Sequence, residues 1–324
     1  MSPPQEPELS VLVISYNTRD LTLACLEALQ RTTDDLAIEI IVFDNASTDG
    51  SARALSERYS DAAEVVLIAS DENLGFARAN NLSARRARGC HLLLLNPDTL
   101  VRPGAVGAAL AFAREHPEAG VVGGRTFFPD GSLNPASCWG RPTVWSLFCH
   151  ALGLTVLFRG NRLLDPESLG SWQRDSVRRV DIVSGCFLLI ERTLWRSLEG
   201  FDEDFFMYGE DADLSLRATA AGRPCMITPA AELVHYGGAS ESVRSDKMVR
   251  LFRAKAQLFA KHWSPGTARF GTRMLGLWAF TRMLAFRALG ILRSDARASA
   301  SAWLSIWRRR DEWRVRTDGS GTPP

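Results

Sequence analysis

Two acidic segments of this 324-residue chain carry residue types that could do chemistry. Asn96-Pro97-Asp98 directly follows the apolar run 92–95, and Glu210-Asp211 comes much later in the sequence. A carboxylate that emerges from a buried strand can bind Mg²⁺ or Mn²⁺ when a diphosphate and water supply the other oxygen ligands. A carboxylate among apolar side chains can have a raised pKa and take a proton from an alcohol. We therefore interpret Asp98 as a metal ligand and Asp211 as a general base, with Glu210 orienting the base or the acceptor.

The second acidic segment is the most specific stretch of the sequence. Its carboxylates are interleaved with Phe205, Phe206 and Tyr208, and we expect these aromatic rings to be buried. Asp213 lies four residues before Arg217 and is interpreted as the structural partner of that arginine. For the first segment an ordinary Asn-Pro-Asp turn remains an alternative to a metal site.

Further polar residues follow other apolar runs and form candidate ligand contacts. Asp44 ends one such run and could accept hydrogen bonds from a base or ribose, although a capping role is the alternative. Around Gly75 a glycine turn, a helix start and a positive side chain suit a phosphate or a ribose. No GxGxxG or GxxxxGK[ST] motif is present, which removes the main support for dinucleotide-binding and P-loop functions. The candidate nucleotide-sugar contacts are Ser15, Tyr16, Asn17, Asp44, Asn45, Gly75, Arg78, Asn80 and Asn96.

His235 is the second candidate metal ligand. It follows an apolar run, as the other candidate ligands do, and could complete a metal site with Asp98. A lone histidine more often has a structural role, and that role is the alternative for His235.

The elements that must position these residues alternate in the first part of the chain. Short β-branched runs indicate buried strands, and segments of helical period lie between them, which predicts an α/β fold with a mostly parallel sheet covered on both faces. Ligands of such sheets bind beyond the carboxyl ends of the strands, where the polar clusters lie. The expected strands are 11–15, 38–43, 65–69, 92–95, 120–123 and 180–190, and the expected helices are 20–31, 49–59, 76–88, 103–115, one from about 191, and 210–221.

The domain organisation follows from changes in periodicity and charge. We expect a catalytic domain over 1–242, with an irregular excursion at about 127–180 on the acceptor side, then a basic amphipathic helical region over 243–316 and a disordered tail over 317–324.

The charge of the chain is strongly divided. Residues 1–242 carry 21 Lys+Arg and 32 Asp+Glu, whereas residues 243–316 carry 17 and 4. The basic region is rich in Trp263, Trp278, Trp303 and Trp307, which favours an anionic membrane surface over nucleic acid as its partner. Ordinary packing of amphipathic helices on the main domain is the alternative.

Several features bear on the compartment. The six cysteines are scattered and mostly among apolar residues, as reduced thiols of a cytosolic protein are. Residues 1–8 lack a basic segment followed by an apolar one, so we expect no signal peptide. The apolar stretch 144–158 is too short to span a bilayer, and 275–292 contains two arginines, so we expect neither to cross a membrane.

Taken in order, these motifs resemble those of the family 2 glycosyltransferases, and within them the bacterial rhamnosyltransferase-like enzymes of cell-surface polysaccharide assembly. The resemblance covers about residues 9–240 and rests on Ser15-Tyr16-Asn17, the run 44–51, Asn73-Leu74-Gly75-Phe76, Asn96-Pro97-Asp98, the run 209–214 and His235.

The resemblance implies a GT-A fold with a Rossmann-like sheet and an inverting transfer. Asp44 would contact the nucleotide base, Asp98 the metal in place of a DxD motif, Asp211 would be the base, and His235 a second metal or diphosphate contact. Asn96 stands where many relatives have the first aspartate of DxD, so Asp98 alone of that motif must hold the cation. The QxxRW motif of processive relatives is absent, which favours the addition of one or a few sugars.

The implied donor is a nucleotide-diphosphate sugar, with dTDP-rhamnose favoured, and the implied acceptor is a glycan or a polyprenyl-diphosphate-linked sugar. The enzyme would be peripheral at the inner face of the cell membrane. The alternatives are a transferase of another sugar, such as UDP-galactofuranose or a UDP-hexose, and a non-catalytic nucleotide-sugar-binding scaffold subunit. A nucleotidyltransferase is disfavoured because the glycine-rich, basic N-terminal loop of such enzymes is missing.

Overall fold

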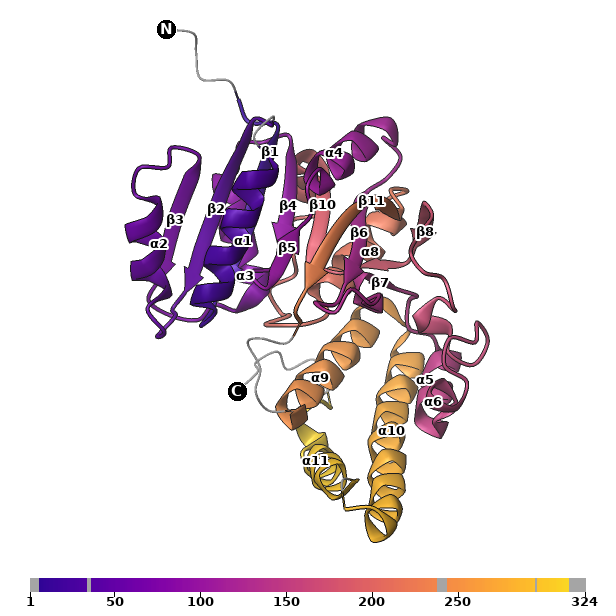
Figure 1. Ribbon diagram of the computed structural model, residues 1–324. Coiled ribbons are helices and arrows are strands. Elements are labelled where there is room, and N and C mark those ends of the chain that lie inside the picture. The colour runs from indigo at the N-terminus through magenta and orange to yellow at the C-terminus, as the bar shows by residue number, and fades with distance from the viewer. Residues whose placement is uncertain (1–5, 34–35, 238–243, 295, 315–324) are drawn as a thin grey trace, which may run out of the picture. The chain divides into compact units, whose positions relative to one another are not determined.

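The computed structural model describes residues 6–33, 36–237, 244–294 and 296–314 (Figure 1). The chain divides into two compact units. The sheet unit comprises residues 1–139, 172–206 and 210–240, and the helical unit comprises residues 140–171, 207–209 and 241–324. The predicted disordered tail, 317–324, and the first five residues of the segment in which no signal peptide is expected lie outside the described residues.

The described part of the sheet unit contains a sheet of nine strands in the order β3-β2-β1-β4-β10-β6-β11-β5, with β8 paired to β11. β7 and β9 form a separate two-stranded sheet. The strands are β1 (Leu9–Ser15), β2 (Ile38–Asn45), β3 (Val65–Ser70), β4 (His91–Leu95), β5 (Thr99–Val101), β6 (Val121–Phe127), β7 (Cys138–Trp139), β8 (Arg178–Val180), β9 (Ile182–Val183), β10 (Phe187–Glu191) and β11 (Cys225–His235).

The predicted parallel arrangement is confirmed for β3, β2, β1 and β4. β10 departs from it, because it lies antiparallel between β4 and β6, and β5 and β8 each pair antiparallel with β11. β10 belongs to the run 180–190, which was expected to be one strand. The run is instead β8, β9 and β10, because it breaks in a turn in which Phe187 N–H donates to Ser184 O at 3.4 Å.

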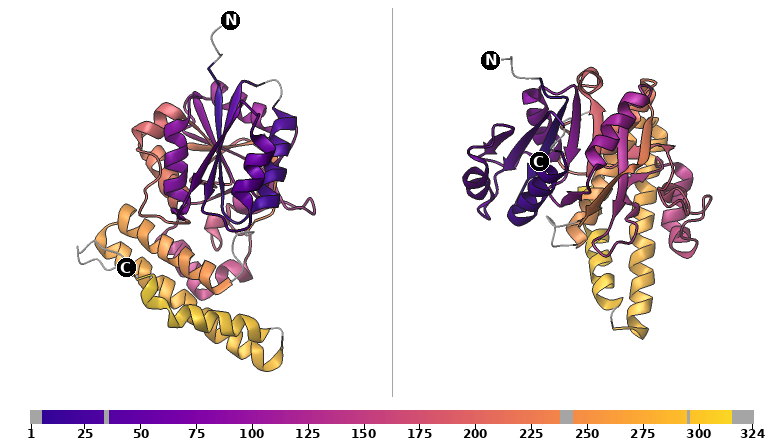
Figure 2. Two further views of the ribbon diagram at one scale, coloured as in Figure 1. Left: turned by 90° about the vertical axis from the view of Figure 1, so that its left-hand side faces the viewer. Right: turned by 45° about the horizontal axis from the view of Figure 1, so that its top comes forward.

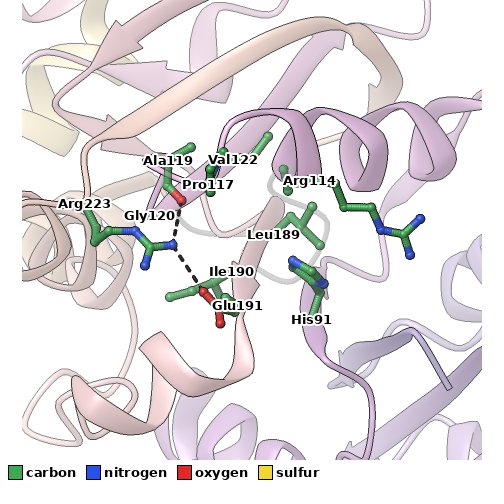
Figure 3. A pocket seen from close by; sticks show the side chains of 11 residues that line it. His91, Arg114, Pro117, Ala119, Gly120, Val122, Leu189, Ile190, Glu191 and Arg223 are labelled. Atoms are coloured by element: carbon green, nitrogen blue, oxygen red, sulfur yellow. Dashed lines mark hydrogen bonds and ion pairs between the residues drawn. The ribbon is translucent and has the colours of Figure 1, made fainter. Parts of the chain in front are cut away.

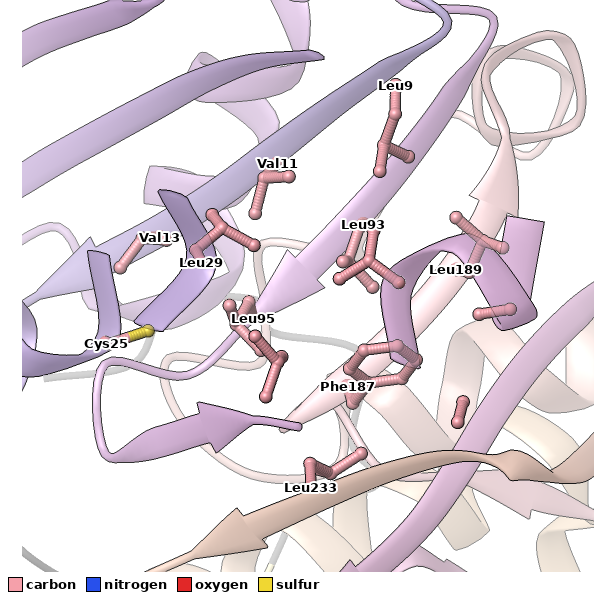
Figure 4. Close-up of a cluster of buried hydrophobic side chains, with 14 of the residues drawn as sticks. Leu9, Val11, Val13, Cys25, Leu29, Leu93, Leu95, Phe187, Leu189 and Leu233 are labelled. Carbon is pink, nitrogen blue, oxygen red and sulfur yellow. The ribbon is translucent and has the colours of Figure 1, made fainter. Parts of the chain in front are cut away.

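Helices lie on both faces of the sheet, as predicted (Figure 2). They are α1 (Arg19–Thr32), α2 (Ser51–Tyr59), α3 (Gly75–Arg86), α4 (Ala105–Glu115), α7 (Arg192–Ser197) and α8 (Glu210–Ala220). On one face α1, α2 and α4 pack on alternate residues of the central strands, including Val11, Leu93 and Leu189 (Figure 4). On the other face α3 packs on Ile14 and Phe43. Each such buried side chain contributes about 1.5–3 kcal/mol, which fixes the strand ends that carry the polar residues.

The helical unit has its own apolar core. Its helices are α5 (Val144–Leu152), α6 (Leu154–Leu157), α9 (Arg244–His262), α10 (Pro265–Leu292) and α11 (Ala296–Arg308). α10 packs against α5, α9 and α11. Trp303 is buried in this core, and Trp263, Trp278 and Trp307 pack against it. These tryptophan rings therefore pack on side chains of the helical unit itself, and the membrane partner of the basic region stays a prediction.

The excursion 127–180 differs from its expected form. Its apolar stretch forms α5 and α6, and Leu147 and Ala151 of α5 belong to the core of the helical unit. Lys255 Nζ of α9 lies 2.9 Å from the buried Glu167 carboxylate. These contacts place residues 140–171 with the C-terminal helices, whereas the sequence placed them in the catalytic domain.

Two sequence-based expectations concern thiols and membrane spans. All six cysteines are free, and five of them are buried, as predicted. Among the described residues one helix, α10, has the length and composition of a membrane span, with a mean hydropathy of 1.3 over its apolar window. Only 22% of that window is buried.

Gly75 starts α3 in a position that only glycine fits. Its φ is 79°, and a Cβ atom there would lie 2.4 Å from the carbonyl oxygen of Phe206. Phe76 N–H donates to that same oxygen at 2.8 Å. The close approach of α3 to the segment before Glu210 therefore depends on the missing side chain.

Gly75→Ala should destabilise the protein more than Gly104→Ala. Both glycines have a positive φ, but a Cβ at Gly104 meets nothing within 4 Å. Gly104→Ala should cost about 1–2 kcal/mol from backbone strain alone. The overlap with Phe206 should add about 1–3 kcal/mol at Gly75. Urea unfolding of the two variants measures the difference, and equal midpoints would contradict the close approach.

Candidate functional site

The predicted polar clusters lie at one edge of the sheet. β2, β1 and β4 are neighbours, and Ser15 is paired with Asp44 while Val13 is paired with Leu95. The residues that follow these three parallel strands therefore emerge side by side. This arrangement is the one that the sequence predicted from the strand ends.

The loops after β1 and β2 are locked together. Asn17 Oδ1 accepts from Thr48 N–H at 2.7 Å, and Asn17 N–H donates to Ser47 Oγ at 3.0 Å. Ser15 is buried, and its hydroxyl lies 3.0 Å from Thr22 Oγ1 inside the protein. Ser15 and Asn17 therefore shape the loops, and Tyr16 between them is half-buried.

Asp44 keeps one buried acceptor without a partner. Its Oδ2 accepts from Ser47 N–H at 3.1 Å, whereas its Oδ1 is buried and has no hydrogen bond. Leaving a buried acceptor unsatisfied costs about 1–3 kcal/mol. A donor group of a ligand, such as an N–H of a base or a ribose hydroxyl, would satisfy this oxygen.

The side-chain amide of Asn45 makes its hydrogen bonds within the protein. Its Oδ1 accepts from Leu74 N–H at 2.8 Å, and its Nδ2 donates to Asn73 Oδ1 at 3.0 Å. Asn80 Nδ2 donates to Phe76 O at 2.9 Å, and its Oδ1 is buried without a partner. Asn45 thus positions the turn that leads to α3.

Arg78, the predicted positive side chain of this segment, is exposed. Its Nε lies 3.8 Å from Glu203 Oε2. The contact is a weak surface ion pair, so the guanidinium can turn toward another anion at little cost.

Asp98 and His235 are brought together by β5. This short strand follows Asp98 and pairs with β11, so that Thr99 is opposite His235. Asp98 Oδ1 lies 3.2 Å from His235 Nε2, and both side chains are nearly buried. Asp98 O also accepts from Tyr236 N–H at 3.0 Å.

The pair offers the donor set of a small divalent-metal site. A carboxylate oxygen and an imidazole nitrogen suit Mn²⁺, and a donor diphosphate would supply further oxygens. The described residues contain no group of three or more His, Cys, Asp or Glu side chains that could hold a metal. Asp98 and His235 fit a cation that is shared with phosphate oxygens.

Residues 185 and 186 connect the Asn96-Pro97-Asp98 segment to the second acidic segment. Gly185 N–H donates to Asp211 Oδ2 at 3.0 Å, and Asn96 N–H donates to Cys186 O at 3.1 Å. Burial, together with the nearby charges of Asp98 and Asp211, raises the pKa of the Cys186 thiol to about 12. Both carboxylates therefore act on one buried thiol.

Sequence reasoning missed this connection. The only local signal is the small-residue turn 184–186, which interrupts an apolar run, and nothing in it names its distant partners.

Glu210 and Asp211 begin α8 in surroundings that disfavour their charge. Burial raises the pKa of Asp211, and burial together with the Asp211 charge raises the pKa of Glu210 well above its ordinary value. Glu210 Oε2 is buried and has no partner. Of the two, Asp211 ionises first because its carboxylate accepts from Gly185 and Ala212 N–H.

The neighbours of this pair follow the predictions in part. Asp213 is buried and lies 2.7 Å from Arg217 Nε, which confirms the predicted i,i+4 pair. Phe205 is buried as expected, but Phe206 is 50% exposed and Tyr208 is half-buried. The expectation was wrong for Phe206: its backbone carbonyl and one edge of its ring lie against Gly75 at the start of α3, but half of the residue stays exposed.

A separate cavity of about 240 Å³ lies at the other ends of the strands. It is lined by His91 at the start of β4 and Glu191 at the end of β10, where Arg223 donates to Glu191 Oε2 at 3.2 Å (Figure 3). Asp98 follows the opposite end of β4. None of the candidate site residues lines this cavity.

Comparison with known proteins identifies the domain that carries the first part of this site, from Ser15 to Asp98. Residues 10–167 match the family described as Glycosyl transferase family 2. The chain contains a family 2 glycosyltransferase domain.

Two relatives of this glycosyltransferase are named rhamnosyltransferases. The chain is 27% identical over 316 residues to the N-acetylglucosaminyl-diphospho-decaprenol L-rhamnosyltransferase of Mycobacterium tuberculosis, covering 92% of this chain and 97% of that protein. It is 27% identical over 235 residues to rhamnosyltransferase WbbL of Escherichia coli, covering 70% and 82%. The predicted glycosyltransferase is thereby confirmed.

Solved structures confirm the GT-A fold. The mannosyltransferase PcManGT from Pyrobaculum calidifontis, solved with GDP-Man and Mn²⁺, has a TM-score of 0.59 at 18% identity and covers 96% of this chain and 89% of its own. GalNAc-T7, solved with UDP, GalNAc and Mn²⁺, has a TM-score of 0.53 at 15% identity and covers 80% and 51%.

Glu210→Gln should weaken the pH dependence of stability. Because the pKa of Glu210 is raised on folding, the folded glycosyltransferase retains a proton that the unfolded chain releases. The free energy of unfolding should therefore fall as pH rises from the unfolded pKa toward the folded pKa. Glutamine cannot ionise, so the variant should lose less stability across that range. Urea unfolding at a series of pH values tests this, with the exposed Glu57→Gln as control; identical slopes for Glu210→Gln and the parent would contradict it.

Proposed function

We propose that this glycosyltransferase moves L-rhamnose from dTDP-rhamnose to a polyprenyl-diphosphate-linked glycan in cell-surface polysaccharide synthesis, with inversion at the transferred carbon. The relatives named rhamnosyltransferases support the sugar, and the diphospho-decaprenol in one of their names supports the acceptor class. The observation that supports the chemistry is the link through residues 185–186 between Asp211 and the backbone of Asn96, two residues before Asp98. An amphiphilic acceptor of this kind favours a peripheral position at the inner face of the membrane.

The residues divide the work of binding the donor. Asp44 accepts a hydrogen bond from the nucleoside through its unsatisfied Oδ1. Asp98 and His235 would hold a divalent cation, which supplies positive charge for the leaving diphosphate. Arg78 stands one turn into α3, where it can reach an anion.

The acceptor side depends on Asp211. Its carboxylate takes the proton of the acceptor hydroxyl as the new bond from oxygen to the sugar carbon forms. The bond from that carbon to the diphosphate breaks on the opposite face, and the nucleoside diphosphate leaves with the electron pair. Burial and the Asp211 charge both raise the pKa of Glu210, so Asp211 carries the negative charge more readily than Glu210 does.

Donor binding is the first test. The thermal midpoint of the purified protein should rise with dTDP-rhamnose and Mn²⁺ and should rise less with UDP-galactofuranose, a UDP-hexose or GDP-mannose. Asp44→Ala and Asp98→Ala should each reduce the rise, whereas the exposed Asp61→Ala should not. A selective rise with another donor would refute the proposed sugar, and no rise with any donor would favour a different function.

Asp211→Asn should remove transfer while it preserves donor binding. Loss of a general base costs about 10²–10⁴-fold in rate. The amide retains the size of the side chain, so the donor-induced thermal shift should change by no more than a few-fold in apparent affinity. The exposed Asp204→Asn, in the same segment, is the matched control. Parent-like turnover in Asp211→Asn would remove this residue from the role of base.

A further inference from the structure

We propose that one surface of the helical unit, formed by the exposed faces of α5, α6 and α10, binds an anionic lipid bilayer. This deepens the proposed function and rests on it, because a polyprenyl-linked acceptor resides in a membrane. The surface uses other residues than the tryptophans that first suggested a membrane partner. We call it the lipid face, and it lies entirely within the helical unit.

The first part of the lipid face is on α5 and α6. Trp145, Phe148 and Leu152 are spaced i, i+3 and i+7, so they share one side of α5, and all three are exposed. Trp145 and Phe148 stack with their ring centroids 5.5 Å apart. Val156 and Leu157 of α6 extend the apolar surface and are 68% and 74% exposed. Large apolar side chains gathered in this way mark an interaction site.

The second part is a stripe on α10. Phe270, Leu277, Leu284 and Ile291 are exposed and recur every seventh residue, which keeps them on one side of a helix. The buried residues of α10, such as Leu275, belong to the core of the unit. The helix is thus apolar on two sides, and within the described part of the chain the side with Leu275 packs in the core while the side with Leu277 is exposed.

The two parts are continuous. Thr281 Oγ1 of α10 donates to the carbonyl oxygen of Ala151 at 2.6 Å, which seats the end of α5 on α10. Leu277 and Leu284 flank Thr281 at i−4 and i+3, and Leu152 follows Ala151. This hydrogen bond therefore brings the end of α5, with Leu152, to the part of α10 that carries Leu277 and Leu284.

The charges on the lipid face select an anionic partner. No Asp or Glu occurs in residues 142–164 or 265–292, which include α5, α6 and α10. Five of the six arginines in these two stretches are exposed. Arg159 and Arg162 follow α6, and Arg269, Arg273 and Arg287 belong to α10. Arginines at the border of an apolar surface can bury their stems while the guanidinium groups bind lipid phosphates.

The bilayer is favoured over a protein partner and over a membrane span. The exposed arginines have no Asp or Glu near them on α5, α6 or α10, so a partner must supply the anions. An anionic bilayer supplies them as phosphates, which lie directly above an apolar layer. If α10 spanned the membrane, Arg282, which donates to His150 O at 3.4 Å, would have to enter the hydrocarbon. The buried side of α10 would also lose its contacts with the core of the helical unit. The geometry fits a helix that lies in the interface.

Vesicle co-sedimentation of the full chain tests the lipid face. The vesicles contain phosphatidylglycerol with phosphatidylcholine, or phosphatidylcholine alone, and neither donor nor acceptor is present, so binding is measured apart from transfer. Leu157→Gln/Leu284→Gln should weaken binding by roughly tenfold or more. Val66→Gln/Leu67→Gln, which changes two exposed apolar residues of β3 in the sheet unit, is the matched control and should bind as the parent does.

A second pair of variants tests the charge. Arg273→Gln/Arg287→Gln should weaken binding to the phosphatidylglycerol vesicles by roughly tenfold or more and leave the weak binding to phosphatidylcholine alone unchanged. Arg31→Gln/Arg53→Gln, on α1 and α2, is the matched control.

Three outcomes would overturn the proposal. They are parent-like vesicle binding by both lipid-face variants, equal binding to the two kinds of vesicle, and a concentration-dependent dimer that only the lipid-face variants disrupt. Transfer to a water-soluble acceptor, measured on the same variants, separates this result from the proposed function. If the parent protein does not transfer sugar to the water-soluble acceptor, that result counts against the proposed function and leaves the vesicle-binding result for the lipid face unchanged.

Discussion

The candidate site depends on one short turn at the start of β10. Through Gly185 N–H and Cys186 O, this turn holds Asp211 and the backbone of Asn96 at the same time. The turn is fixed because β10 is inserted antiparallel between β4 and β6, where its side chains are buried. Two acidic segments that are far apart in the chain become parts of one site for this reason.

Several buried polar atoms at the same edge of the sheet have no hydrogen-bond partner. Asp44 Oδ1, Glu210 Oε2 and His235 Nδ1 are all buried without a partner. The buried Asp213 differs from them, because its carboxylate is paired with Arg217. A bound donor and acceptor can recover part of the free energy that the unpaired atoms cost, which suits a site that must favour ligand binding.

The helical unit is stabilised by a network of charged and polar side chains around Glu167. Burial opposes the charge of Glu167, but Lys255 and His150 outweigh it and hold the pKa of this carboxyl far below its ordinary range. Ser146 Oγ donates to the same carboxylate at 2.6 Å, which ties the start of α5 to α9 through one acid. This network orders the segment that presents Trp145 and Phe148, so the exposed apolar surface rests on a rigid support.

The sequence by itself determined the alternating strands and helices, the polar residues at the strand ends and the Asp213–Arg217 pair, because periodicity and i,i+4 spacing are local properties. It also indicated Asp98 and His235 as possible partners. Only the tertiary structure decided that β5 and β11 bring them within 3.2 Å, that β10 runs antiparallel, and that residues 140–171 join the C-terminal helices. It also decided which apolar residues face the core and which face solvent. These outcomes depend on contacts between segments that are distant in the chain, and no local pattern encodes which distant segment will complete a buried surface.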